Sequence, residues 1–459
     1  MSRHPKRTNI PAGRSVSRRG FLGAALTAVP AAGLLAKDAV SQAAAAPVQA
    51  APEASKIKEY RTLGRTGFKV SDVSFGAGPL NNANVLMAAI DRGMNYIDTA
   101  EHYERGGSER AIGEALAASD RKKVFITTKL NLTFNKQNSK DEIKARYAKC
   151  LERMKIEAAD CLMLHMCTLA QVKHEPYHEA VRELKAEGRV RFSGLSNHGA
   201  DNSLSGQLNE PQEDVVLAAA EDGRFDVVLC VYNYLKTDSG EKIFKACGSK
   251  NMGLTLMKMN PALTTADERE MIKHYQERLK APGKELPERL TKLLHYTDER
   301  GAAVEAFLKK YGLAGPEQAR DAAISFCLSR PEVHCVCPSI NSFEELDAYV
   351  ALSGKRFTPK DAQMLADAKD TYGDLVCRIG CVDCQGACPQ GIPVNSIMRY
   401  DYYFRAQGRE KMAMAEYSAL DGRNASACAS CPGYCESACP YGVPIQGKLL
   451  LAHHTLTLS

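Results

Sequence analysis

From about residue 60 to residue 355, short apolar runs alternate with longer segments whose apolar positions recur at helical spacing. The eight apolar runs span residues 71–77, 95–100, 124–130, 161–166, 190–196, 226–232, 253–259 and 333–340. Strands that alternate with helices form parallel sheets with right-handed crossovers. The pattern therefore predicts an α/β fold, a closed (β/α)8 TIM barrel over residues 59–355. An open, doubly wound sheet is the alternative, although no GxGxxG motif follows the first run.

Residues 260–312 interrupt this alternation with a stretch that is rich in charged residues and helical in pattern. We interpret it as a helical insertion in the barrel, either a lid over the site or a solvated decoration, and we expect the decoration. Residues 356–376, which follow the last repeat, are interpreted as a connecting segment.

Polar residues stand where four consecutive runs end: Asp98, Lys129, His165, and Ser196 with Asn197. Each of these residues, taken alone, could equally be a capping residue or a buried polar residue that is hydrogen-bonded within the protein. A barrel carries its chemistry at the carboxyl ends of its strands, so residues at the ends of four neighbouring strands are expected to face one cavity.

Tyr103 follows Asp98 by five residues, and its phenol is a weak proton donor at neutral pH because its ordinary pKa is about 10. A nearby ammonium on Lys129 would lower that pKa, and Asp98 would hold the lysine in place. His165 could orient a substrate carbonyl or share the proton. The four residues predict a general acid for carbonyl reduction.

The segments that carry these residues resemble the aldo/keto reductase family, in the same order, across about 280 residues: YRTLGRTGFKVSDVSFGAG, DTAEHY, GGSERAIGEAL, ITTKL, LMLH and LKAEGRVRFSGLSNH. The resemblance implies a barrel that binds NADPH or NADH and transfers a hydride to or from a small carbonyl or alcohol substrate. It implies a catalytic tetrad of Asp98, Tyr103, Lys129 and His165. The implied cofactor contacts are Ser196 and Asn197 and, after the eighth run, Ser339 and Asn341.

Half of the sixteen cysteines are scattered through the barrel region, where we interpret them as small core residues, and half lie in residues 377–459. The latter form two groups, Cys377, Cys381, Cys384 and Cys388 before Pro389, and Cys428, Cys431, Cys435 and Cys439 before Pro440. Both groups resemble the ferredoxin run C-x2-C-x2-C-x3-C-P, whose fourth cysteine serves the other of two 4Fe-4S clusters. By that logic one cluster is held by Cys377, Cys381, Cys384 and Cys439, and the other by Cys388, Cys428, Cys431 and Cys435.

Residues 377–459 are therefore predicted to form a small, ferredoxin-like iron–sulfur domain that binds two 4Fe-4S clusters. The segment between the two cysteine groups is aromatic and has a helical pattern. Zinc sites or four disulfides are the alternatives, although the two Cys-Pro endings are not typical of zinc sites.

The first 46 residues carry seven lysines or arginines against one acid, Asp38, which accounts for the whole net charge of +6. The remainder is near neutral, and no nucleic acid partner is expected. SRRGFLGAALTAVPAAGLL, from Ser17, resembles a twin-arginine signal, with a small-residue cleavage site in SQAAAAP and a linker at residues 47–58. A basic tail followed by an uncleaved anchor is the alternative.

The signal predicted at the N-terminus and the clusters predicted near the C-terminus are consistent with each other. The twin-arginine route carries folded proteins, and iron–sulfur clusters are assembled inside the cell, so an exported cluster protein must load its clusters first. The sequence predicts a periplasmic oxidoreductase of aldo/keto reductase type that is carried by the Tat export machinery. It would couple hydride transfer to electron transfer through its clusters, with a redox partner protein or a quinone-linked donor.

Two positions depart from the family pattern. Leu229 stands in the sixth run, where the family usually has a glutamine that binds the nicotinamide amide. After the eighth run, where the family often has a basic residue for the adenosine phosphate, this chain has Glu344 and Glu345. These departures leave a second hypothesis open, a periplasmic electron-transfer or binding module whose barrel does not turn over nicotinamide.

Overall fold

The computed structural model describes residues 55–133, 138–199, 210–261, 265–278, 285–420 and 422–457. The signal predicted for residues 1–46 and most of the linker predicted for residues 47–58 lie outside these ranges. Within them, no helix combines the length and the apolar content that a membrane crossing requires.

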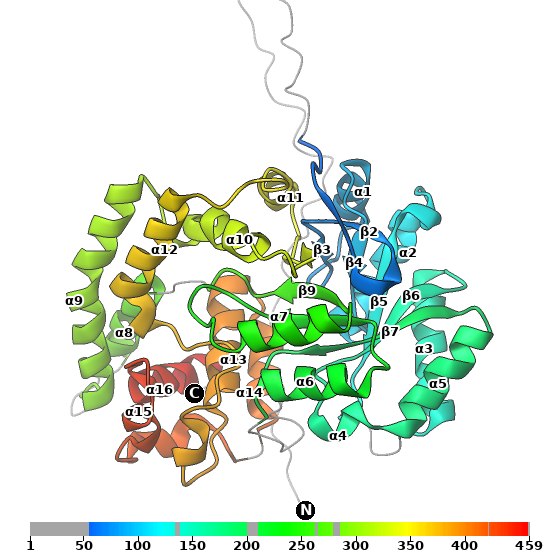
Figure 1. Cartoon of the computed structure of the whole chain (residues 1–459). Helices are drawn as coiled ribbons and strands as arrows, with labels where there is room; N and C mark the ends of the chain where they lie inside the picture. The colour runs from blue at the N-terminus through cyan, green and yellow to red at the C-terminus, as the bar shows by residue number, and fades with distance from the viewer. Residues whose placement is uncertain are drawn as a thin grey trace, which may run out of the picture. The chain divides into compact units, whose positions relative to one another are not determined.

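A sheet of eight parallel strands forms the centre of the described chain (Figure 1). In chain order its strands are β3 (Phe75–Gly76), β4 (Tyr96–Asp98), β5 (Phe125–Leu130), β6 (Ala159–Leu164), β7 (Val190–Asn197), β8 (Val227–Val231), β9 (Gly253–Met257) and β10 (Cys335–Val336). Each strand pairs with the next, and parallel bridges from Val73 to Val336 and from Gly76 to Ser339 close the ring. The predicted (β/α)8 barrel is confirmed, and each predicted run contains or overlaps one strand.

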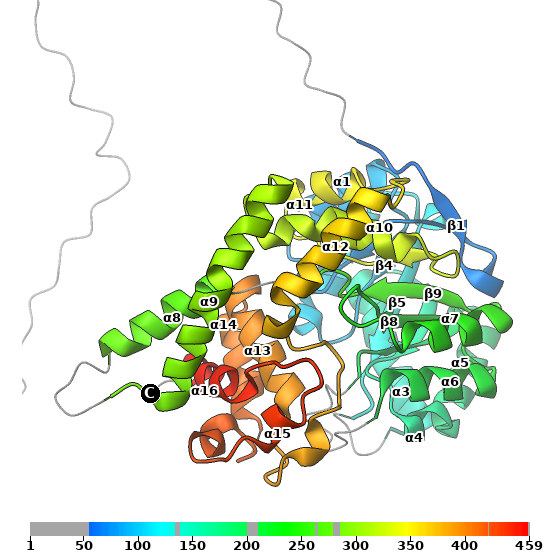
Figure 2. The same ribbon diagram turned by 60° about the vertical axis from the view of Figure 1, so that its left-hand side comes forward.

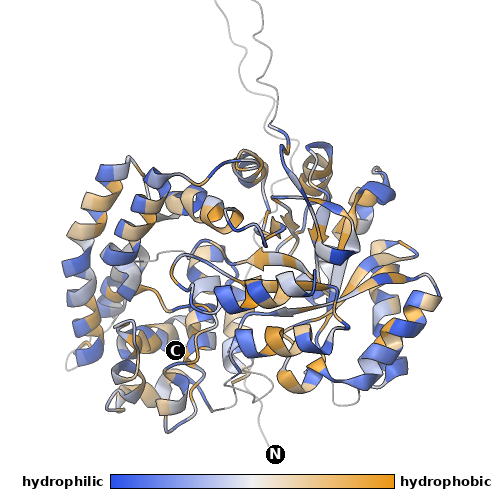
Figure 3. Cartoon of the chain, viewed as in Figure 1, coloured by the Kyte–Doolittle hydropathy of each residue, from blue (hydrophilic) through white to orange (hydrophobic). Residues whose placement is uncertain are grey.

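Helices follow the strands and cover the outside of the barrel. They are α1 (Ala83–Asp91), α2 (Gly107–Leu116), α3 (Lys140–Met154), α5 (Glu175–Ala186), α6 (Gln212–Asp222), α7 (Gly240–Ser249), α10 (Arg320–Leu328) and α11 (Phe343–Val350). Every residue of β5 and β6 is buried, because helices cover one face and the barrel interior the other. Figure 3 shows the resulting pattern, with apolar residues along the strands and polar residues on the outer faces of the helices.

The insertion after β9 forms α8 (Thr265–Arg278) and α9 (Glu288–Tyr311), and the predicted connecting segment forms α12 (Pro359–Tyr372), which packs on α9. Leu290 and Leu293 of α9 share a small core with Leu450 and Leu451 of the C-terminal helix α16 (Ile445–Leu456). The expectation of a solvated decoration is therefore wrong, because one face of the insertion is buried against the C-terminal helices.

A buried ionic cluster adds to this contact. Glu268 of α8 accepts a hydrogen bond from Lys448 of α16 at 2.5 Å and from Arg405 of α13 (Val394–Gln407) at 3.3 Å. Arg405 also pairs with Asp401, one turn earlier in α13. The insertion thus bridges the two C-terminal helices.

The C-terminal region has a core of its own, formed by α13, α14 (Glu410–Ser418), the short α15 (Tyr434–Ser437) and α16. Ile397, Tyr417 and Leu449 are among its buried members. The described part of residues 377–459 contains no β-strand, which differs from the βαββαβ plan of ferredoxin-like folds. The helical spacing of apolar and aromatic residues between the cysteine groups explains why this part forms helices.

The loop of the first cysteine group lies against the carboxyl ends of the barrel strands, and Figures 1 and 2 both place α13 beside the barrel. Gly199, which follows β7, packs so closely on Gly380 that a Cβ on either glycine would overlap the backbone of the other segment. Arg378 Nε donates to the carbonyl of Leu235 at 3.1 Å, and Lys236 Nζ donates to the carbonyl of Gly380 at 3.2 Å. The C-terminal region is therefore docked on the mouth of the barrel.

Candidate functional site

The four residues of the predicted tetrad meet at the carboxyl ends of β4, β5 and β6. Asp98 ends β4, Lys129 is next to last in β5, His165 follows β6, and Tyr103 begins a short 3-10 turn after β4. Lys129 Nζ donates to Asp98 Oδ1 at 2.5 Å and to the carbonyl of Thr99 at 2.7 Å. The same ammonium lies 5.1 Å from the centre of the Tyr103 ring.

Burial governs the protonation of these residues. It raises the pKa of Tyr103, and the nearby Lys129 counteracts only part of that rise. Burial also opposes the charge on Lys129, but the Asp98 carboxylate outweighs it, so the pKa of Lys129 is raised and its ammonium persists. Lys129 lowers the pKa of Tyr103, as expected, but burial raises that pKa by more. Tyr103 therefore stays protonated at neutral pH.

His165 brings a neutral imidazole to the site. Its ring meets Tyr103 edge-on, with centroids 5.6 Å apart, and stacks on His102 at 4.8 Å. Burial, reinforced by His102 and Lys129, holds the pKa of His165 well below its usual range. Among the described residues, His165 Nδ1 and Asp98 Oδ2 have no hydrogen-bond partner, a rare situation for buried polar atoms. A ligand beside His165 would supply the partner that the ring nitrogen lacks.

The loops around the site have unusual backbone conformations. Glu104, Arg105, Met166 and Lys258 have positive φ angles of 49°, 53°, 54° and 58°, although none of them is glycine. They directly follow the tyrosine and the histidine of the tetrad and the end of β9. Such conformations persist only where the surrounding structure enforces them, and they cluster at functional sites.

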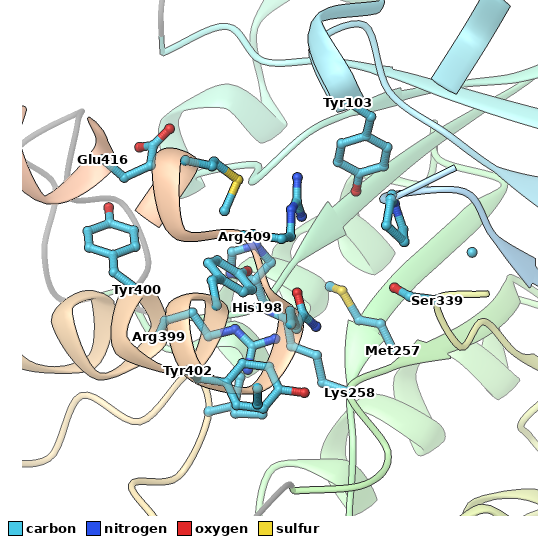
Figure 4. Close-up of a pocket in the computed structure, with 18 of the residues that line it drawn as sticks. Tyr103, His198, Met257, Lys258, Ser339, Arg399, Tyr400, Tyr402, Arg409 and Glu416 are labelled. Atoms are coloured by element: carbon cyan, nitrogen blue, oxygen red, sulfur yellow. The ribbon is translucent and has the colours of Figure 1, made fainter. Parts of the chain in front are cut away.

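A cavity of about 1250 Å³ opens in front of the tetrad (Figure 4). Its barrel side includes all four tetrad residues together with Ser196, Leu229, Lys258, Ser339 and Asn341. Its other side is formed by α13 and α14, with Arg399, Tyr400, Tyr402, Tyr403 and Arg409. Sequence reasoning missed this second wall, because no motif marks these helices as part of an active site.

Asn197, which the family resemblance assigned to the cofactor, does not line this cavity. Its Nδ2 donates to the carbonyl of Cys167 at 2.6 Å, and its Oδ1 accepts from the backbone N–H of Gly199 at 2.7 Å. Both ends of the amide are therefore engaged by the protein itself. Ser196, Ser339 and Asn341 do reach the cavity.

The eight C-terminal cysteines divide between two smaller cavities. One is lined by Cys377, Cys381, Cys384 and Cys439, and the other by Cys388, Cys428, Cys431 and Cys435. Each sequence group sends its last cysteine to the other cavity, which is the exchange that the ferredoxin run implies. Val394, the first residue of α13, borders both cavities.

The cysteines are neither paired nor gathered around a point. None of the sixteen forms a disulfide in this structure. In the part of the chain that the structure describes, no three His, Cys, Asp or Glu side chains are placed to hold a single metal ion. A zinc site would need four sulfur ligands about 2.3 Å from one ion, whereas here the thiols line two small cavities, four in each.

Cys377 lines both the first cysteine cavity and the large cavity that contains the tetrad. Asn395 does so too, and its Nδ2 lies 3.5 Å from Cys377 Sγ and donates to the carbonyl of Arg378 at 2.7 Å. The first cysteine cavity therefore adjoins the large cavity that contains the tetrad, while no cysteine of the second cavity borders it.

Known proteins resemble the barrel region. Residues 79–370 match the model of the aldo/keto reductase family. YqkF, an uncharacterized oxidoreductase of Bacillus subtilis, is 34% identical over 149 residues, which make up 30% of this chain and 48% of that protein. L-galactose dehydrogenase of Arabidopsis thaliana is 29% identical over 197 residues, 39% of this chain and 58% of that protein. The chain thus spans about half the length of the curated relatives it matches.

Among solved structures, the holo form of the aldo-keto reductase AKR11C1 from Bacillus halodurans is 19% identical to this chain. The match covers 67% of this chain and 95% of that one, with a TM-score of 0.47.

Proposed function

This chain belongs to the aldo/keto reductase family, and we propose that it is an oxidoreductase that reduces a small aldehyde or ketone, or oxidises the corresponding alcohol. The observation that carries the proposal is that the buried Asp98, Lys129 and His165 and the half-buried Tyr103 meet on one cavity. His165 Nδ1 has no hydrogen-bond partner among the described residues, and a substrate oxygen would supply one.

Tyr103 is the proton donor in this proposal. Its raised pKa keeps the phenol protonated at neutral pH, so that it can donate to a carbonyl oxygen. Negative charge then develops on the tyrosine oxygen, and the buried Lys129 ammonium stabilises it. Asp98 keeps Lys129 charged and in place, and His165 binds the substrate oxygen through its ring nitrogen.

The cavity has room and polar groups for a nicotinamide cofactor, which Ser196, Ser339 and Asn341 would contact. When bound, NADH or NADPH supplies a hydride for the carbonyl carbon. The turn after β10 suits a 2′-phosphate poorly, because Asn341 N–H donates to the Glu345 carboxylate at 2.7 Å and Glu344 adds a second negative charge. We therefore propose NADH rather than NADPH.

We further propose that the two cysteine cavities hold two 4Fe-4S clusters. Four thiols line each cavity, and thiolates are the ligands of such clusters. Much of the remaining lining is apolar, for example Val443 and Ile445 in the first cavity and Ile392 and Leu449 in the second, and apolar surroundings limit the access of water. When bound, a cluster accepts or donates one electron at a time.

The position of Cys377 supports different electron-transfer roles for the two cysteine cavities. The first cavity adjoins the barrel cavity, so it suits exchange with the active site. The second cavity suits exchange with a redox partner protein or a quinone-linked donor. Export through the twin-arginine route into the periplasm is part of the same proposal, and it rests on residues 1–46 alone.

A second candidate function is an electron-transfer or binding module whose barrel does not turn over nicotinamide. Two observations favour it. Leu229 presents an aliphatic side chain to the cavity, and the Asn197 amide is engaged by Cys167 and Gly199.

Full-length protein purified without oxygen separates the two candidates. We expect visible iron–sulfur absorbance that bleaches when NADH is added, and we expect Tyr103→Phe to slow carbonyl reduction by at least about 100-fold at unchanged iron content. Absorbance that is indifferent to both nucleotides would favour the module. A colourless protein without iron would contradict the clusters, and full turnover in Tyr103→Phe would exclude the tyrosine as the proton donor.

A further inference from the structure

The first cysteine cavity contains a buried cation. Arg378 lines this cavity next to Cys377 and is only 5% exposed. Its contacts within the described part of the chain are to backbone carbonyls, and it forms no ion pair with a carboxylate there. Buried charges are ordinarily paired, because a charge that leaves water loses its hydration without compensation. An anionic group in the cavity would supply the missing counter-charge.

Backbone carbonyls hold the Arg378 guanidinium in place. Its Nε donates to the carbonyl of Leu235 at 3.1 Å, and its Nη1 donates to the carbonyls of Val376, at 2.6 Å, and Gly373. The guanidinium also lies 4.4 Å from the centre of the Tyr441 ring, which lines the same cavity. These partners are neutral, so they orient the positive charge without cancelling it.

The guanidinium lies within electrostatic reach of the cavity thiols. Burial lowers the pKa of Arg378, and Tyr441 and three thiols of the cavity counteract this effect. The three thiols belong to Cys377, Cys439 and Cys381. An arginine remains charged in proteins, and four thiolates that hold a cluster bring negative charge. The thiolates of the first cavity would therefore pair with Arg378.

The other charges near this cavity do not cancel that of Arg378. Asp383, which also lines the cavity, accepts a hydrogen bond from Cys381 Sγ at 3.1 Å. Its side chain is exposed, so water screens its charge far more than that of the buried guanidinium. Lys236, whose Nζ donates to the carbonyl of Gly380 at 3.2 Å, adds positive charge near Cys381.

The second cysteine cavity lacks a comparable charge. Among the described residues, its lining contains no charged side chain. Arg289 of α9 donates to the carbonyl of Cys431 from outside the lining, and it is partly exposed. N–H groups contact sulfur in both cavities, at 3.4 to 3.5 Å. The buried charge, rather than hydrogen bonds to sulfur, therefore distinguishes the two cavities.

We propose that Arg378 is the counter-ion of the cluster in the first cavity and raises its reduction potential above that of the cluster in the second. Reduction adds negative charge, and a buried cation favours the more negative state. The inference rests on the two proposed clusters. The single electron of a half-reduced protein then resides in the first cavity, which adjoins the cavity of the tetrad at Cys377. An electron from a one-electron redox partner thus leaves the second cluster and reduces the first, toward the barrel.

Redox titration of the full-length protein purified without oxygen, followed by electron paramagnetic resonance, tests the inference. We expect two potentials. Arg378→Gln should lower the higher one, so that the preference of the electron for the first cavity falls at least about tenfold, or about 59 mV, at unchanged iron per chain. Arg378→Lys, which keeps the charge, should restore most of the difference. The matched control is Arg289→Gln at the second cavity, which should leave the higher potential unchanged.

A further variant assigns the two potentials without altering Arg378. Cys384→Ser removes a thiol from the first cavity and should leave only the signal at the lower potential. A remaining signal at the higher potential would overturn the inference, whatever the effect of Arg378→Gln. Two potentials that both ignore Arg378→Gln would also overturn it, while the proposed clusters would stand. A protein without iron would refute the proposed clusters and the inference with them.

Discussion

The barrel and the C-terminal region contain eight cysteines each, yet the two sets are placed differently. The barrel cysteines are all buried and scattered through the core, where burial raises the pKa of Cys161 and Cys230, for example. The C-terminal cysteines collect in fours around two cavities, and half of them are partly exposed. The comparison teaches that the spacing of cysteines, rather than their number, carries the functional information.

The two regions also differ in how they are stabilised. The barrel closes its own sheet and encloses the largest core of the described chain. The C-terminal region has a smaller core and buries further surface against α8, α9 and the barrel mouth. Small units of this kind need additional support, so the C-terminal region should be the more sensitive to single changes.

The largest expected effect contrasts the two sets of cysteines directly. Cys384→Ser removes a thiol from the first cysteine cavity, and the protein should lose at least about half of its iron, since one of two clusters loses a ligand. Cys247→Ser replaces a buried barrel cysteine and should keep all of it. Iron per chain and visible absorbance measure the difference. Equal iron in the two variants would contradict the contrast between the regions.

The next effect concerns the buried ionic cluster. Glu268→Gln leaves Lys448 and Arg405 without their shared carboxylate, and breaking a buried pair costs about 3–5 kcal/mol of the free energy of unfolding. The exposed Glu299 of α9 provides a control, because Glu299→Gln should change that free energy by less than about 0.5 kcal/mol. Urea titration followed by helical circular dichroism measures both. Similar free energies of unfolding for Glu268→Gln and Glu299→Gln would mean that the buried ionic cluster does not stabilise the C-terminal region.

A smaller effect is expected where the two regions touch. Gly199 and Gly188 both have positive φ, 80° and 70°, so alanine strains the backbone at either position. Only at Gly199 would the added Cβ also overlap Gly380, whereas space is open around Gly188. Gly199→Ala should therefore lower the free energy of unfolding by about 1–3 kcal/mol more than Gly188→Ala. Thermal unfolding compares the two, and an equal loss would show that the docking can relax.

The smallest effect depends on pH and vanishes at neutral pH. His102 is open to the cavity, but the protein around its ring desolvates the imidazole and lowers its pKa to about 4, with Lys129, Arg409 and Arg146 adding to this effect and Glu101 opposing it. The unfolded chain therefore binds more protons between about pH 6.5 and pH 4, and stability falls as the pH falls through this window. His102→Gln should make the dependence between pH 7 and pH 5 less steep in urea titrations, while His165 and His198, whose pKa values burial also lowers, keep their share of it. An unchanged slope would assign the dependence to other groups.

The strands and the tetrad could be predicted from the sequence because their signals are local. Strands buried on both faces read as apolar runs, and the tetrad residues stand at or just after the ends of those runs. The division of the cysteines could also be predicted, because short spacings leave the chain few ways to place four thiols together. His102 could have been found, since it precedes Tyr103 in the loop after β4, at the same end of the barrel as His165, which follows β6.

The rest depends on contacts between segments far apart in the chain. Arg399 lies in a helical pattern like that of any solvated arginine, but the docking of the C-terminal region on the barrel brings it to the cavity. Glu268 stands in a charged stretch that ordinarily indicates solvent, but its partner Lys448 comes from the last helix. Asn197 matched the family pattern, and only the three-dimensional arrangement shows that Cys167 engages its amide.

The contact between Gly199 and Gly380 also links the path of the first cysteine loop to the packing of the barrel mouth. Gly380 lies between Cys377 and Cys381, so the loop that carries these two cysteines must reach its final path before it can pack against Gly199. We therefore expect a cysteine loop that has not reached this path to leave the junction at Gly199 open, so that the packing of the barrel mouth reports on the state of the C-terminal region.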